Sequence, residues 1–162
     1  MEFNNSSIPV SPWIKEWNEL IRRVIYPDEQ LRELMMLPEG TDIITFIERY
    51  FIRADATDKL LTNENVRIVY GKVRQDPTDV PNVTDATWSF DIYVKREHQR
   101  DASVDRLLYR TQLIAHRLIQ LLNKKQYHGI GIKFKRPKEG DLNTRTIGYD
   151  RYYVSFHVFE TY

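Results

Sequence analysis

The chain of 162 residues contains no cysteine, which excludes disulfide bonds, thiolate nucleophiles and cysteine-based zinc sites. It also lacks an excess of charge of either sign, since 24 Lys and Arg residues balance 23 Asp and Glu residues. A net charge of +1 makes no strong case for a nucleic-acid or membrane partner. No apolar run approaches the roughly 20 residues that span a bilayer, and residues 1–10 are too polar for a signal peptide. We therefore expect folding in a reducing cytoplasm, without membrane association.

Catalytic motifs are missing as well. Asp91 and Lys95, with Glu64 upstream, faintly resemble a metal-dependent nuclease, but the spacing between acid and lysine does not fit that arrangement. The segment 129–131, Gly-Ile-Gly, lacks the Lys-Ser/Thr of a phosphate loop. No close metal-ligand pair occurs among the four histidines, which are His98, His116, His128 and His157. We expect no enzymatic activity, no cofactor and no metal site.

Alternating apolar and polar residues predict four strands in the second half of the chain. In residues 88–95 the alternation is almost strict, with Trp88 and Phe90 on one face and Asp91 and Tyr93 on the other. Similar patterns occupy residues 66–73, 130–135 and 152–159. Period two with aromatic and β-branched residues is typical of half-buried antiparallel strands. The four segments therefore predict two β-hairpins.

A long amphipathic helix is predicted between the two hairpins. Leu107, Leu108 and Leu118 belong to its apolar stripe, and the acids Asp101 and Asp105 suit its first turn. Lys124, Lys125 and Gly129 are typical of a helix end. Most such stripes pack against a core, so we expect this helix to cover the sheet.

The first third of the chain predicts three shorter helices. Residues 1–10 form a polar tail, and residues 12–25 have helical periodicity with Ser11 as the expected N-cap. Further helices are expected at 28–36 and, capped by Thr41 or Asp42, at 42–51. Because Pro38-Glu39-Gly40 interrupts the pattern, we divide the chain into a helical N-terminal extension, 1–39, and a main domain, 40–162.

The fold class expected from these patterns is α+β. It consists of an antiparallel sheet of about four strands, with a long helix between two β-hairpins, helices packed on one face and a helical N-terminal extension. The segments 75–86 and 137–148 are polar and are predicted as the hairpin loops. Hairpin loops usually contain about two to five residues, so these longer ones suggest contact with a partner.

A basic segment, Lys133 to Lys138, has two interpretations. Basic residues interleaved with an aromatic one can bind nucleic acid. Lysines also protect sheet edges from unwanted pairing, or meet an acidic surface of a neighbouring subunit. The balanced overall charge favours an edge or subunit contact.

The order of elements resembles the tail-terminator and tail-completion proteins of long-tailed bacteriophages. The resemblance covers residues 40–162: an opening helix at 42–51, the strand Ala86 to Val94, the helical run Asp105 to Asn123, and two closing strands. It is one of layout, without an invariant motif. It implies a structural virion protein without catalytic residues. Such proteins form a ring, commonly of six copies, that terminates the tail tube and joins it to the head connector.

The resemblance implies particular partners and a location. By this resemblance, we expect the chain to bind itself in a ring, a hexamer in the family's common pattern. We also expect it to bind the tail tube protein and the head–tail connector or stopper protein, with DNA only as cargo that passes through the ring. Assembly in the host cytoplasm would place it in the neck of the virion. One alternative is another neck or connector component, which the long N-terminal extension leaves open. The other, from a different class, is a small nucleic-acid-binding protein or nuclease.

Two sets of candidate contact residues follow from this assignment. Partner-binding residues are expected on the two loops, at Asp76, Asp79, Asn82, Lys138, Asp141 and Arg145. A subunit interface is expected on the mixed, tyrosine-rich sheet face, at Tyr93, Tyr153, His157 and Phe159. Tyrosine is enriched at interfaces because it combines a large rigid surface with a polar tip.

Overall fold

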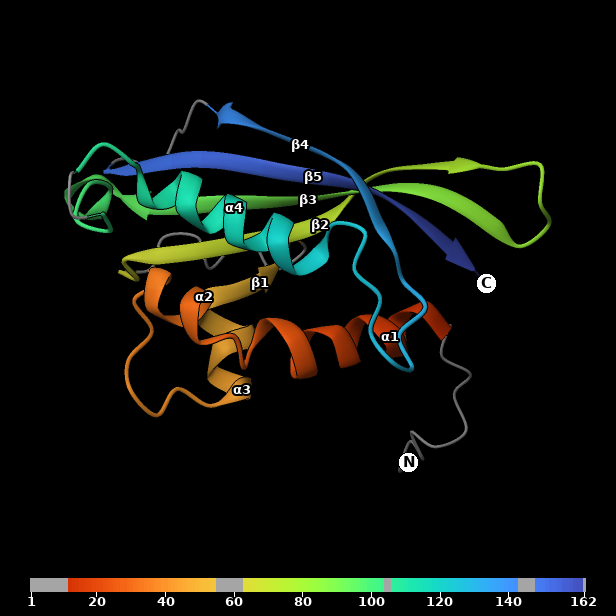
Figure 1. Ribbon diagram of the computed structural model, residues 1–162, viewed down its shortest axis with the longest axis horizontal. Helices are drawn as coiled ribbons and strands as arrows, with labels where there is room; N and C mark the ends of the chain where they lie inside the picture. The colour runs from red at the N-terminus through yellow and green to blue at the C-terminus, as the bar shows by residue number, and fades with distance from the viewer. Residues whose placement is uncertain (1–11, 55–62, 104–105, 143–147, 162) are drawn as a thin grey trace, which may run out of the picture.

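The computed structural model describes residues 12–54, 63–103, 106–142 and 148–161 as one sheet with helices on one side (Figure 1). The sheet has the strand order β1-β2-β3-β5-β4. Its strands are β1 (Phe51–Arg53), β2 (Val66–Pro77), β3 (Val83–Lys95), β4 (Phe134–Leu142) and β5 (Tyr149–Thr161). The α+β class is confirmed.

The sheet is mixed and has five strands where the sequence predicts about four antiparallel ones. β2, β3, β5 and β4 pair antiparallel, but the short strand β1 runs parallel to β2, with Phe51 opposite Ile68. Residue Phe51 was expected to end a helix and instead begins this strand. A three-residue strand carries too little alternation to be recognised from sequence.

The predicted alternation of the strands explains the core. Phe90, Ile92, Val154 and Phe156 are fully buried, while Asp91 and Tyr93 between them are only partly covered. The helix α4 (Arg110–Leu122) packs on the buried face, where Leu118 is fully buried. One face of β3 and β5 therefore belongs to the core, and the other remains available.

The N-terminal helices enter the same core as the sheet. α1 (Pro12–Leu20) continues as the π-helical turn η2 (Ile21–Ile25), which agrees with the predicted helix at 12–25; the expected cap Ser11 lies outside the described residues. Trp17 is 5% exposed, and its ring centroid lies 5.1 Å from that of Trp88 and 5.2 Å from that of Tyr70. The 1–39 segment thus contributes aromatic surface to the packing of the sheet.

Asp28 connects α2 (Glu29–Leu34) to α4. Its carboxylate accepts a hydrogen bond from the backbone N–H of Leu31 at 2.8 Å, which makes it the N-cap of α2. It also accepts two hydrogen bonds from Arg117, from Nε at 3.0 Å and from Nη2 at 2.5 Å. Burial raises the pKa of Asp28, but the hydrogen bonds from Arg117 and Leu31 outweigh it and leave this pKa below its ordinary value.

We expect Asp28 to make stability depend on pH in the acid range. A folded-state pKa below the unfolded one, about 3.9, stabilises the fold above that pH and loses this contribution as pH falls through the folded pKa. Asp28→Asn keeps the cap but removes the ion pair, so its melting temperature should fall at pH 7 and approach that of the parent at pH 2–3. Thermal melts of both proteins across this pH range test this. A constant difference between them would contradict the assignment.

The helix predicted at 42–51 is divided into two shorter elements. α3 (Ile43–Thr45) and the π-helical turn η3 (Phe46–Tyr50) replace the single helix expected at 42–51, and Asp42 caps them by accepting the N–H of Thr45 at 2.7 Å. Of the two expected caps, Thr41 and Asp42, the structure confirms Asp42. Phe46 and Tyr50 are buried, but Ile44 and Ile47 are exposed at 57% and 39%.

The start of the long helix was predicted too early. α4 begins at Arg110, after the short 3-10 turn η5 (Arg96–His98) and an irregular loop, and its N-cap is Tyr109. Leu107 and Leu108 are 78% and 49% exposed and do not belong to the apolar stripe. Asp101 does not cap the helix: it binds the Arg110 side chain at 2.6 Å, and Asp105 lies outside the described residues. The helix ends at Leu122, and the left-handed residue after its C-cap is Lys124.

Neither predicted hairpin loop is as long as expected. β2 continues to Pro77 and β3 begins at Val83, so the polar segment 75–86 is mostly paired strand, and only residues 78–82 connect the two. Similarly, β4 continues to Leu142, so much of 137–148 is strand. β4 begins at Phe134 rather than Ile130, although Ile130 and Ile132 are buried. The misplaced loops contain proline and few apolar residues because these strand ends are not covered by the core.

Candidate assembly surfaces

A β-hairpin arm extends beyond the helix-covered part of the sheet (Figure 1, the yellow-green hairpin on the right). We define the arm as residues 74–85, from the bulge that follows Lys72 to the residue before the buried Ala86. All its side chains are exposed or half-buried, and Val80 in the turn is 59% exposed. The end of β5 pairs with its second strand, Val83 opposite Thr161. This pairing holds the arm in line with the sheet.

Three predicted partner-binding residues lie together on this arm. Asp76 pairs across the hairpin with Asp85 and forms an ion pair with Arg74 at 2.8 Å. Asp79 and Asn82 are exposed in the turn, where Asn82 adopts a positive φ of 62°. Asparagine tolerates the left-handed region better than most residues, which explains its place in the turn.

The other predicted partner-binding residues lie along β4. Lys138 and Asp141 are exposed on this edge strand, opposite Ser155 and Tyr152 of β5. Arg145 lies outside the described residues. Because β3 and β5 are antiparallel, Asp141 lies near the end of the sheet opposite the arm. The two predicted contact regions therefore occupy opposite ends of the sheet.

The predicted interface residues share the face of the sheet opposite α4. Register places Tyr93 opposite Arg151 and Tyr153 opposite Asp91, so these four side chains form one group across β3 and β5, which we call the open-face cluster. Arg151 donates a hydrogen bond to the carboxylate of Asp91, and its guanidinium lies 5.5 Å from the centroid of the Tyr93 ring. Burial raises the pKa of Tyr93, which keeps its hydroxyl protonated.

Arg151 was missed in the sequence, although period-two alternation from Tyr153 places it on the same face. Its Nε is one of three buried side-chain nitrogen or oxygen atoms in the described residues that lack a hydrogen-bond partner. Tyr153 packs over a glycine in the neighbouring strand, since a Cβ added at Gly140 would lie 3.1 Å from its ring. Arginine and tyrosine, like tryptophan, are enriched at the energetic centres of protein interfaces.

His157 and Phe159 continue this face toward the arm. The His157 Nδ1 lies 3.2 Å from the Asp85 carboxylate, and Phe159 is 50% exposed. The ammonium group of Lys135 lies 5.2 Å from the centroid of the Phe159 ring. The structure thus brings all four predicted interface residues to one face, with Phe159 at the base of the arm.

The acids considered for a nuclease have other partners. Asp91 is bound by Arg151, and Lys95 donates to the backbone carbonyl of Asn63 at 3.0 Å. Glu64 is buried and lies 2.9 Å from Arg49 and 3.6 Å from Arg67. Within the described ranges, no group of three or more His, Asp or Glu side chains is placed to hold a metal ion.

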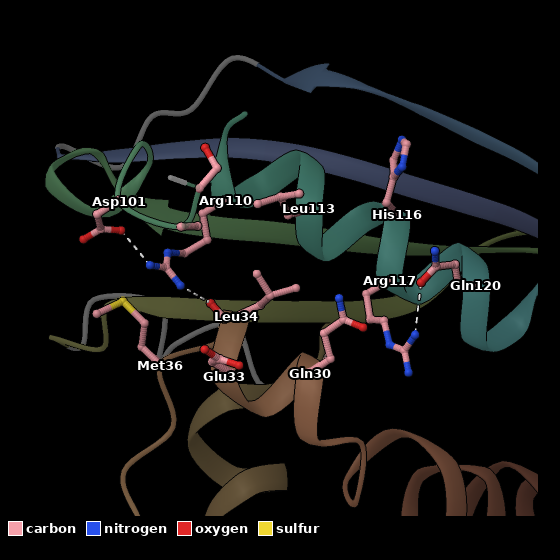
Figure 2. A pocket seen from close by; sticks show the side chains of 12 residues that line it. Gln30, Glu33, Leu34, Met36, Asp101, Arg110, Leu113, His116, Arg117 and Gln120 are labelled. Carbon is pink, nitrogen blue, oxygen red and sulfur yellow. Dashed lines mark hydrogen bonds and ion pairs between the residues drawn. The ribbon is translucent and has the colours of Figure 1, made fainter. Parts of the chain in front are cut away.

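A polar groove of about 510 Å³ lies between α2 and α4 (Figure 2). At one end, Arg110 donates to the carbonyl of Leu34 at 2.8 Å and binds Asp101 at 2.6 Å. Burial raises the pKa of Asp101, but hydrogen bonds from Arg110 and His98 outweigh it and lower this pKa. Arg110 therefore connects the C-terminal end of α2 to the start of α4. We interpret the groove as the junction between these two helices and not as a binding site.

The comparison with known families gives a match along nearly the whole chain. The YomW family model matches residues 3–158. The chain belongs to the YomW family. None of the curated proteins matches this YomW-family chain. In the part of the chain that the structure describes, no helix is both long and apolar enough to cross a membrane.

Proposed function

We propose that this YomW-family chain is a structural virion protein that forms a ring at the head-proximal end of a bacteriophage tail. In that position it would terminate the tail tube and join it to the head connector. The phage-derived family name and the order of elements, with one helix between two hairpins, support this proposal. A protein of this kind acts through its surfaces, so the proposal stands on what those surfaces offer.

The observation that carries the proposal is the open-face cluster. Asp91, Tyr93, Arg151 and Tyr153 form a half-buried group in the middle of the sheet, on the side away from the helices. A partner covering this face would desolvate an aromatic and arginine-rich centre, the composition of an interface hot spot. In a ring, each subunit would present this face to its neighbour through a head-to-tail contact that closes on itself.

The arm supports the second part of the proposal, contact with the tube or connector. It extends past the core, and its turn carries Asp79, Val80 and Asn82 on the surface. A ring would present one arm from each copy on the same side. Several weak contacts made together give a stable attachment, because each bound arm raises the effective concentration of the next.

The proposal includes the absence of enzymatic activity. Asp91 and Glu64, the acids that a nuclease would use, are both engaged by arginines. Binding a catalytic metal would require breaking these ion pairs, and carboxylates that converge on one point are what metal catalysis needs.

We expect Tyr153→Asp to prevent ring formation. The new carboxylate would stand directly opposite Asp91, and like charges on paired strand positions repel by a few tenths to about 1 kcal/mol. The fold should remain stable, because Tyr153 is only half-buried in the single chain. A subunit interface that covers this position would be disrupted, because it would bury the new carboxylate. Sedimentation velocity and thermal melting of the same samples separate the two effects.

The matched control is His116→Asp, which adds the same charge on the exposed side of α4, where the His116 side chain is 68% exposed. It should assemble like the parent. If Tyr153→Asp assembles as well as the control does, the open face is not the subunit interface. A parent protein that remains monomeric, alone and with tail tube protein, would refute the ring itself.

A further inference from the structure

A basic cleft lies where α4 gives way to β4. It has a volume of about 500 Å³ and is lined by five residues, Lys124, Gln126, Lys133, Lys135 and Arg136. All five are exposed, and no carboxylate lines the cleft. Four cations around one concave surface concentrate positive potential there, although the chain as a whole is nearly neutral.

The cations of the basic cleft are not tied up in ion pairs within the described part of the chain. Among the described residues, no carboxylate forms an ion pair with Lys124, Lys133, Lys135 or Arg136. The acids of the same strand lie further along it, and one of them, Glu139, approaches His116 at 3.7 Å. A surface that only protects a sheet edge needs lysines along the strand, but it does not need a cleft that joins them to Lys124 beyond the helix.

Two of these cations occupy backbone positions that favour glycine. Lys124 follows the C-cap of α4 with a φ of 55°, and Arg136 lies in the irregular pairing between β4 and β5 with a φ of 53°. Helix ends and β-bulges often have a residue in this left-handed conformation, which glycine adopts without steric cost. The chain has a cation at both positions, and both side chains line the same cleft.

An exposed aromatic ring lies next to the basic cleft. Phe159 is 50% exposed, and the ammonium of Lys135 is 5.2 Å from its ring centroid. Cations that follow a phosphate backbone, combined with an aromatic surface for a base, are the usual components of a single-strand binding site. An acidic protein surface would require the cations alone.

We propose that the basic cleft binds the phosphate backbone of a nucleic acid, with Lys124, Lys133, Lys135 and Arg136 as the phosphate contacts. This is a direct activity of the folded chain and does not depend on ring formation. It differs from the passive passage of DNA through a ring, because it assigns the contact to named side chains at one place on the surface.

The left-handed backbone conformations of Lys124 and Arg136 allow charge to be removed without destabilising the fold. Lys124→Gly with Arg136→Gly removes two charges from the cleft and also relieves two unfavourable backbone conformations, so the fold should keep its melting temperature. The control is Arg106→Gly, which removes one exposed cation at a φ of 59° before the start of α4 and is compared with the loss per charge in the double variant. α4 has 13 residues and is about 20 Å long, so this control lies well away from the cleft.

The experiment measures fluorescence anisotropy of labelled 20-nucleotide single-stranded and double-stranded DNA with the full chain, across a salt series. The parent should bind at low salt, and the double glycine variant should bind about tenfold more weakly, with a salt slope shallower by roughly two. Arg106→Gly should match the parent. Tighter binding of single-stranded DNA would assign Phe159 to base stacking. Equal binding of single-stranded and double-stranded DNA would indicate contacts with the phosphate backbone only.

Three results would overturn the proposal. They are no DNA binding by the parent at low salt, an equal loss in Arg106→Gly, and tighter binding of poly-glutamate than of DNA, which would indicate an acidic protein partner. Sedimentation velocity of the same samples reports ring formation separately. A chain that assembles without binding DNA keeps the proposed function and loses only this inference.

Discussion

Replacement of Leu118 by aspartate is expected to unfold the protein. Leu118 is fully buried in α4, in the same core as Ile114 and Phe90. Truncating a buried leucine costs about 2–5 kcal/mol, and placing a carboxylate in an apolar site adds several more. Domains of this size are stable by only about 5–15 kcal/mol, so the substitution should remove most or all of the folded population.

Circular dichroism and thermal melting measure this effect. His116→Asp, two residues earlier and exposed, is the control and should melt close to the parent. A Leu118→Asp protein that melts like the parent would show that this side of α4 does not face the core.

Removal of the arm is expected to leave the fold intact and to abolish joining of tails to heads. In this variant, the dipeptide Asn-Gly replaces Asp76–Asp85 and links Gln75 to Ala86. These two residues are paired in the sheet. Asn-Gly forms the two-residue turn that antiparallel strands favour. The buried residues from Ala86 onward keep their partners, so the melting temperature should change by only a few degrees.

The matching measurement is electron microscopy of particles from a complementation experiment with the arm-deleted protein. We expect tails and heads that remain separate, because the surface that would touch the tube or connector is missing. Normal, fully joined virions would contradict a role for the arm and would weaken the proposed function as a whole.

The sequence predicts the core of this fold because burial and alternation coincide there. Trp88, Phe90 and Ile92 alternate with polar residues, and the structure buries each of them. Caps follow similar local rules, so the position before an apolar run narrowed the cap to Thr41 or Asp42, and the structure shows Asp42. The helix at 12–25 was predicted from its periodicity, but the contact of Trp17 with Trp88 depends on how α1 packs against the sheet, which sequence periodicity does not give.

The arm could not be predicted because its strands leave the core. Periodicity arises from burying one face, and the residues from Arg74 to Pro77 are exposed or half-buried on both faces. Their polar composition, with a proline, therefore resembles a loop. The start of α4 was predicted too early for a related reason. Asp101 has the chemistry of an N-cap, but its carboxylate pairs with Arg110, a contact that exists only in the folded chain.

Among the candidate contact residues, strand register explains why three of them lie on one face and why Arg151 was overlooked. Tyr93, Tyr153 and His157 share a face because all three occupy the same phase of alternation in paired strands. Arg151 has that phase as well, but its role depends on contacts across the sheet to Asp91 and Tyr93. Only the pairing of β3 with β5 reveals that group.

The most direct test of the central claim is the mass of the assembled protein. Native mass spectrometry of the full chain, alone and with a phage tail tube protein, should give a closed oligomer, expected as six copies of the 19.4 kDa chain. Tyr153→Asp should lower that mass to a single chain. A parent protein that stays at 19.4 kDa in both conditions, at every concentration measured, would contradict the account.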